Sequence, residues 1–112
     1  MWIMLPEGIV SVAESPDNDT MLMVRARHRD VLRKVREGCG RNRTGAILHT
    51  PERDYQYRVY VKKDIFAAWV AHRVRTIDYS KFKPTAVSTS LHNLYVRVWA
   101  VINEHYAIRR VK

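Results

Sequence analysis

Strict two-residue alternation in the stretch Tyr55–Lys62 constrains the fold of this chain more than any other feature. Aromatic and branched residues occupy one set of positions and mostly polar residues the other: Tyr55, Tyr57, Val59 and Val61 against Gln56, Arg58, Tyr60 and Lys62. Successive side chains of a strand point to opposite faces of a sheet. The pattern therefore predicts a strand with one face buried and the other facing solvent.

A β-hairpin is predicted near the N-terminus. The segments Gly8–Glu14 and Met21–Arg27 flank SPDNDT, a run that is dense in turn-forming residues. In the second segment, alternate positions again separate into two sides: Leu22, Val24 and Ala26 against Met21, Met23, Arg25 and Arg27.

These two alternations together predict a basic sheet face. If Val24 and Val59 face the helices, the side chains of the other parity must project from the opposite face. Those residues are Arg25, Arg27, Arg58, Tyr60 and Lys62. Such a face can hold phosphates with its guanidinium groups and stack a base on Tyr60. The alternative is an ordinary solvent-facing strand surface, with Met21 and Met23 covered by Trp2–Leu5.

The period changes to a helical one from about Arg29. Apolar residues at 31, 32 and 35 predict a helix of about ten residues that ends at Gly38 and Gly40. The segment Ala46–Thr50 is a weak strand candidate. Its position before Tyr55–Lys62 places a turn at PERD.

Two further helices are predicted in the second half of the chain. Asp64 has the character of an N-cap for a helix over Ile65–Ile77. After the loop Asp78–Pro84, a last helix is expected over Leu91–Tyr106, and basic residues at 109, 110 and 112 form a cationic tail.

The element order β-β-α-(β)-β-α-α predicts an α+β fold, a small antiparallel sheet with helices packed on one face. At 112 residues the chain has the size of one domain. The expected core consists of Val24, Val59, Val61, Phe66, Trp69, Val70, Leu94, Val98 and Ile102.

Positive charge is concentrated between Arg25 and Arg43. These nineteen residues hold eight basic and two acidic side chains, a net +6 of the chain's +9. Such a field favours polyanions or acidic protein surfaces as partners, although a charged face is also often merely solvated. Within this stretch Arg29, Arg33 and Arg36 recur at i, i+4 and i+7 and would line one stripe of the first helix. A stripe of this kind suits a nucleic-acid groove or an acidic protein patch, and a solvated outer helix face is the alternative.

Signatures of catalysis and metal binding do not stand out. No GxSxG motif, glycine-rich phosphate loop or close carboxylate pair occurs, and no His pairs with another His or with Cys39 at ligand spacing. We expect no catalytic residues, no metal and no cofactor, and therefore a protein that is not an enzyme. The arginines around Gly38-Cys39-Gly40 predict a lowered thiol pKa, although a lone Cys is usually passive.

Several features bear on location and partners. The apolar runs are short, such as Ile65–Ala71, so no membrane span is expected. MWIMLPEG has no basic region or cleavage site of a signal peptide, and the single cysteine fits a reducing cytoplasm. The apolar stretch that includes Trp2 can dock onto its own core, onto a second copy in a homodimer, or onto another partner.

Five motifs in chain order carry a resemblance to a known group. They read GIVSV (Gly8–Val12), VRAR (Val24–Arg27), DYQYR (Asp54–Arg58), IDYSKFK (Ile77–Lys83) and VW (Val98-Trp99). Together they resemble a group of small, mostly uncharacterised proteins of bacteria and of phages that infect actinobacteria. The resemblance implies no established activity. It implies a phage or mobile-element origin and action by binding a host component.

We therefore expect a small cytoplasmic binding module, acting in the host cytoplasm if phage-encoded. Its residues for nucleic acid or another partner would be Arg25, Arg27, Arg29, Arg33, Arg36, Arg58, Tyr60 and Lys62. Nucleic acid bound through the basic sheet face is the favoured reading. The alternative is an effector that binds or inhibits an acidic host protein, in an anti-defence or host-takeover role.

Overall fold

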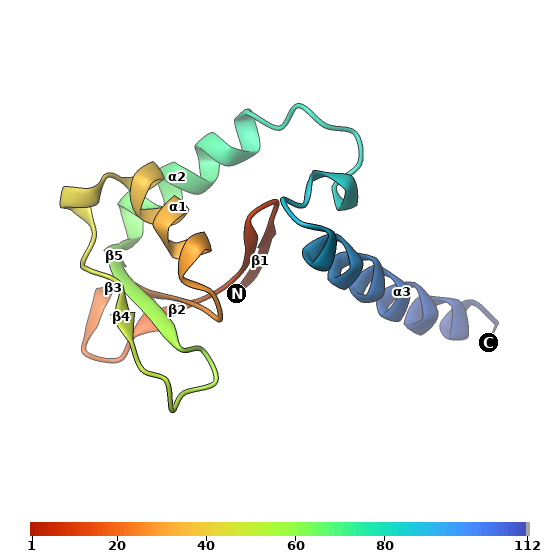
Figure 1. The fold of residues 1–112 in the computed structure, drawn as a ribbon, viewed down its shortest axis with the longest axis horizontal. Helices are drawn as coiled ribbons and strands as arrows, with labels where there is room; N and C mark the ends of the chain where they lie inside the picture. The colour runs from red at the N-terminus through yellow and green to blue at the C-terminus, as the bar shows by residue number, and fades with distance from the viewer. Residues whose placement is uncertain (112) are drawn as a thin grey trace. The chain divides into compact units, whose positions relative to one another are not determined.

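Five antiparallel strands form one sheet in the order β1-β2-β3-β5-β4 (Figure 1). The computed structural model describes the backbone of residues 1–111 and the side chains of residues 1–107. The strands are β1 (Trp2–Leu5), β2 (Gly8–Ser15), β3 (Asn18–Ala26), β4 (Leu48–His49) and β5 (Tyr57–Lys62). The predicted cationic tail lies outside the described side chains.

Three α-helices accompany the sheet: α1 (Arg29–Cys39), α2 (Lys63–Arg75) and α3 (Thr89–Val111). Two short 3-10 turns, η1 (Arg41–Arg43) and η2 (Lys83–Thr85), lie in the connections. The predicted α+β class is confirmed. The chain divides into two compact units, Met1–Asp78 and Tyr79–Lys112, while the expectation of a single domain stays a prediction.

The core of the first unit lies between the sheet and the pair α1 and α2, which cover the same sheet face (Figure 1). Helix α1 contributes Val31, Leu32 and Val35, as its spacing predicts, and α2 contributes Phe66 and Trp69. The sheet contributes Leu5, Val10, Val12, Val24, Ala26, Val59 and Val61 to this cluster. Of the expected core, Val24, Val59, Val61, Phe66 and Trp69 are buried, while Val70 is half-buried at the edge of the cluster.

Strand β1 was not expected from the sequence. Its four residues, WIML, are all apolar, so they show no alternation that could reveal a strand. Pairing with β2 nevertheless orients them: Ile3 lies opposite Val10 and turns toward the core, whereas Trp2 lies opposite Ser11. The N-terminal ammonium also donates to the Val12 carbonyl at 2.7 Å, which holds the start of β1 against β2.

The N-terminus of α2 differs from the prediction. The helix begins at Lys63, Lys62 occupies the N-cap position, and no side chain caps it. Asp64 therefore lies inside the first turn, where its charge still complements the helix dipole. Because β5 leads directly into α2, no residues remain for a separate cap.

Two residues of the expected core, Leu94 and Ile102, are exposed instead, at 42% and 49% of their surface. Both lie on α3, where Tyr95 is the one buried residue among those whose side chains the structure describes. The ring of Tyr95 lies 5.0 Å from that of Phe82, so the connector before α3 packs an aromatic residue onto the helix. The helical spacing correctly indicated a helix, but it could not say which side is covered.

Candidate functional site

One row of paired residues crosses all five strands on the sheet face away from α1 and α2. The row runs Trp2, Ser11, Arg25, Arg58 and Leu48, each lying opposite the next. Directly opposed residues of antiparallel strands share a face. The neighbouring row holds Ala13, Met23 and Tyr60, and Lys62 follows opposite Met21. We call the surface formed by Ser11, Met23, Arg25, Arg58 and Tyr60 the arginine face.

Arg25 and Arg58 lie directly opposite each other at the centre of the arginine face. Both are half-buried, and the Nε atom of each is buried without a hydrogen-bond partner. Their other contacts are neutral: Arg25 Nη2 donates to Ser11 Oγ at 2.9 Å, and Arg58 Nη1 to Met23 Sδ at 3.6 Å. The Tyr60 hydroxyl shares the same sulfur at 3.7 Å. Two positively charged residues are thus directly opposed on neighbouring strands, and neither has an ion pair with a carboxylate among the described residues.

Arg27 extends this surface beyond the end of β3, but its charge is already paired. Its Nη2 contacts both carboxylate oxygens of Asp54 at 3.1 Å. Its guanidinium also lies 4.6 Å from the ring of Tyr55, and that of Arg25 lies 5.1 Å from the same ring. The alternation places Tyr55 with Val59, and this placement is wrong, because β5 begins only at Tyr57 and Tyr55 turns to the arginines.

Two of the acidic residues near the N-terminus form ion pairs with α2 rather than with the arginine face. Glu7 contacts Arg73 at 2.8 Å, and this ion pair is largely buried. Glu14 contacts the ammonium of Lys63 at 2.7 Å. The local negative charge of the first strands therefore stabilises the packing of α2 and leaves Arg25 and Arg58 uncompensated.

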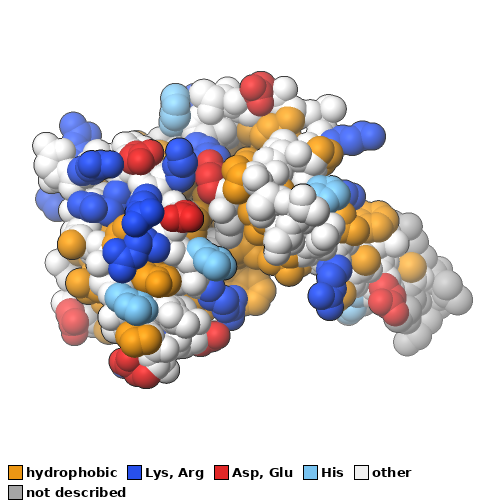
Figure 2. Space-filling view, in the orientation of Figure 1, with side chains coloured by type: hydrophobic (Ala, Val, Ile, Leu, Met, Phe, Trp, Pro, Cys, Tyr) orange, Lys and Arg blue, Asp and Glu red, His pale blue; other side chains and the backbone are white. Residues whose placement is uncertain are grey.

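The arginines of α1 form a separate group on the other side of the sheet, because α1 packs on the face opposite the arginine face. Arg29, Arg33 and Arg36 line one stripe as the spacing predicts, and Arg41 of η1 joins them. Figure 2 shows basic side chains gathered over α1 and the segment that follows it. The eight predicted partner-binding residues are thus divided between two surfaces, with Arg25, Arg27, Arg58, Tyr60 and Lys62 on the first.

The predicted lowering of the Cys39 thiol pKa is wrong. The side chain is buried among core residues at the end of α1, and this burial raises the pKa of its thiol to about 11. Burial disfavours the thiolate more than the nearby arginines favour it. At neutral pH the thiol is therefore protonated and a poor nucleophile.

Neither the histidines nor the acidic residues gather into a metal site in the described part of the chain, where no three His, Cys, Asp or Glu side chains cluster suitably. His49 instead stacks on Tyr57, with the ring centroids 4.7 Å apart. Among the described helices, none combines the length and apolar character needed to cross a bilayer.

Leu48 and Tyr55 are residues of this site that sequence reasoning missed, and Trp2 was expected only as a docking residue outside the sheet face. Trp2 and Leu48 end the central row and expose 76% and 47% of their surface. The turn residues Pro6-Glu7-Gly8 after WIML are a signal that could have indicated a hairpin there. Comparison with protein families, with curated proteins and with solved structures finds no match.

Proposed function

We propose that this chain is a small non-enzymatic phage-type binding module that holds single-stranded nucleic acid on its arginine face in the cytoplasm. The observation that carries the proposal is the uncompensated pair Arg25 and Arg58. Like charges directly opposed on neighbouring strands destabilise a sheet. A phosphate bound by the two guanidiniums would compensate both charges and so remove this repulsion.

Aromatic residues border these arginines and suit a single strand better than a duplex. Tyr60 lies one row from Arg58, and the largely exposed Trp2 ends the central row. Unstacked bases stack on exposed aromatic rings, whereas the bases of a duplex are already stacked on each other. Lys62, exposed at the end of β5, adds a further cation for the backbone.

The first test measures the affinity of labelled single- and double-stranded DNA and RNA at several salt concentrations. The double variant Arg25→Gln with Arg58→Gln should weaken single-strand binding at least about tenfold, because hydrogen bonds between charged groups are lost. The dependence of log affinity on log salt should become shallower by about 1.4, or roughly 0.7 for each lost phosphate contact. Arg27→Gln should have a smaller effect, because this exposed arginine lies beyond the end of β3 and outside the opposed pair Arg25 and Arg58.

The matched control is Arg33→Gln with Arg36→Gln, which removes the same charge from the opposite side of the sheet. Circular dichroism of both double variants tests whether they remain folded. Equal weakening by the two variants would mean that binding follows net charge, and the sheet-face proposal would then be wrong. Reversal of all four charges at 25, 27, 58 and 62 should abolish binding.

A protein partner is the second candidate, and the exposed Trp2 and Leu48 favour it. These apolar side chains flank the arginines in one row, and Trp and Arg dominate the energetics of protein interfaces. An acidic host protein would fit this surface. Saturable binding of one such protein that survives nuclease treatment and is lost in Trp2→Ala would favour this function over nucleic-acid binding.

A further inference from the structure

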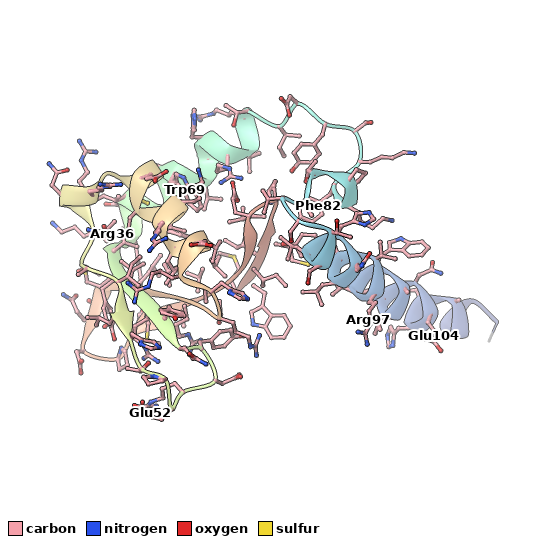
Figure 3. The ribbon with its side chains drawn as sticks, viewed as in Figure 1. Arg36, Glu52, Trp69, Phe82, Arg97 and Glu104 are labelled. Carbon is pink, nitrogen blue, oxygen red and sulfur yellow. The ribbon has the colours of Figure 1, made fainter. Side chains whose placement is uncertain are left out.

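A concavity of about 390 Å³ lies beside α1, on the side of the sheet opposite the arginine face. We call it the α1 groove. Its lining is Arg29, Arg33, Arg36, Arg41, Ala46 and Ile47. Figure 3 labels Arg36, which extends from α1. The volume lies in the range of sites for small molecules, about 300–1,000 Å³.

Two of the four guanidiniums are held in place by neutral groups. Arg36 donates through Nε to Thr44 Oγ1 at 3.1 Å and through Nη2 to the Arg41 carbonyl at 3.4 Å. Arg29 lies 5.2 Å from the centre of the Tyr57 ring. Hydroxyl, carbonyl and ring contacts orient a guanidinium without neutralising it. The positive charge of Arg29 and Arg36 is therefore fixed in position and still available to a ligand.

The other two arginines have weak, exposed ion pairs at the rim. Arg33 contacts Asp30 at 3.1 Å, and Arg41 approaches Glu37 only to 3.9 Å. Exposed pairs of this kind contribute little and exchange readily. The groove thus presents four guanidiniums, of which two lack any carboxylate partner among the described residues.

We propose that the α1 groove binds a compact oligophosphate, a pyrophosphate or triphosphate group, at a site separate from the arginine face. A group with three or four negative charges in a small volume matches four guanidiniums that converge on one concavity. Arginine offers paired N–H donors that fit phosphate oxygens, so several oxygens can be bound at once. Ala46 and Ile47 supply an apolar wall, so the groove accepts the oligophosphate either free or as part of a nucleotide.

The test is calorimetric titration with pyrophosphate, tripolyphosphate and a nucleoside triphosphate at about 150 mM salt. We expect saturable binding of tripolyphosphate with one site per chain. Arg36→Gln should weaken it at least about tenfold, because a charge-assisted contact is lost. Tighter binding of the nucleoside triphosphate than of tripolyphosphate would show that the apolar wall contacts the nucleoside. Equal binding of the two would show that the groove binds the phosphates alone.

Thr44 provides a sharper test, because it touches Arg36 and acts only through it. Thr44→Val should weaken binding about three- to tenfold by releasing Arg36, whereas Thr44→Ser keeps the hydroxyl and should restore it. Arg53→Gln is the control for charge, since this exposed arginine lies outside the groove. Absence of saturable binding, or equal losses in Arg53→Gln and Arg36→Gln, would overturn the proposal.

The nucleic-acid proposal and the oligophosphate proposal can be tested independently of each other. The variant Arg25→Gln with Arg58→Gln should leave tripolyphosphate affinity within about twofold, because these residues lie on the opposite sheet face. If that variant lost tripolyphosphate binding and Arg36→Gln kept it, the oligophosphate site would belong to the arginine face. The α1 groove proposal would then be wrong.

Discussion

Arg25 and Arg58 occupy positions at which a positive charge lowers the stability of the free protein. Their side chains oppose each other on neighbouring strands, half-buried, with both Nε atoms unpartnered. A like-charge pair in this geometry costs roughly 0.2–1 kcal/mol, and burial of an unsatisfied donor adds to that cost. Sites that bind ligands often retain such unfavourable residues because the ligand compensates them.

Replacing Arg58 with methionine should therefore stabilise the free protein. Arg58→Met removes the repulsion and can pack beside Met23, so the free energy of unfolding should rise by about 0.5–1 kcal/mol in low salt. The gain should shrink as salt screens the pair, and affinity for nucleic acid should fall. Urea denaturation at two salt concentrations measures the change.

Arg27→Met is the control for this prediction. Arg27 forms an ion pair with Asp54 and stacks on Tyr55, so its loss should not stabilise the fold. If Arg58→Met lowered stability as much as Arg27→Met, the charge pair at the centre of the arginine face would not be a source of strain.

Helices α1 and α2 approach each other closely through Gly38. This glycine lies in the last turn of α1, and Trp69 of α2 is buried against it. A Cβ atom at position 38 would overlap the indole ring of Trp69. The two glycines at the end of α1 thus have different roles. Gly38 permits the close approach of Trp69, and Gly40 adopts a positive φ of 96° after the last helical residue.

Gly38→Ala should destabilise the protein although alanine is the better helix former. Helix propensity favours alanine by about 1 kcal/mol. Displacing a buried tryptophan typically costs more, and we expect a net loss of about 1–3 kcal/mol. Thermal unfolding followed by tryptophan fluorescence measures it. Gly45→Ala is the matched control, since its nearest neighbour would be the Tyr60 carbonyl oxygen at 3.7 Å, and a neutral Gly38→Ala would contradict this packing.

At the scale of the whole molecule, the hydrophobic core belongs to one of the two compact units. Every residue of the core cluster lies between Leu5 and Trp69, inside the unit Met1–Asp78. The arginine face and the α1 groove are formed by residues of the same unit. Folding and both proposed binding sites should therefore need only this part of the chain.

A chain ending at Asp78 should fold cooperatively and keep both binding activities. We expect its unfolding temperature to stay within several degrees of the full chain, since no core cluster residue is removed. Circular dichroism and the titrations above measure the outcome. A chain ending at Lys62 is the control, because it lacks Phe66 and Trp69 and should not fold. If the chain ending at Asp78 unfolded without a cooperative transition, residues 79–112 would be needed to complete the fold.

Prediction from sequence was most accurate for elements with a regular apolar pattern whose apolar side is buried throughout. The alternation around Val24 and Val59 and the spacing of Val31, Leu32 and Val35 identified buried faces correctly. The alternation rule missed the strand Trp2–Leu5, because all four of its residues are apolar. Helical spacing wrongly placed Leu94 and Ile102 in the core, because these apolar residues of α3 are exposed. Periodicity reports which side chains share a side but not which side a neighbour covers.

The same distinction separates what the sequence by itself determined from what tertiary structure decided. Alternation placed Arg25, Arg58 and Tyr60 on one face, because the side-chain period of a strand is a local property. Only strand pairing brought Arg25 opposite Arg58 and added Trp2 and Leu48 to their row. Likewise, helical spacing aligned Arg29, Arg33 and Arg36, but Arg41, Ala46 and Ile47 join them through the fold of the following loop. Register and loop closure depend on residues far apart in the chain, which no local pattern encodes.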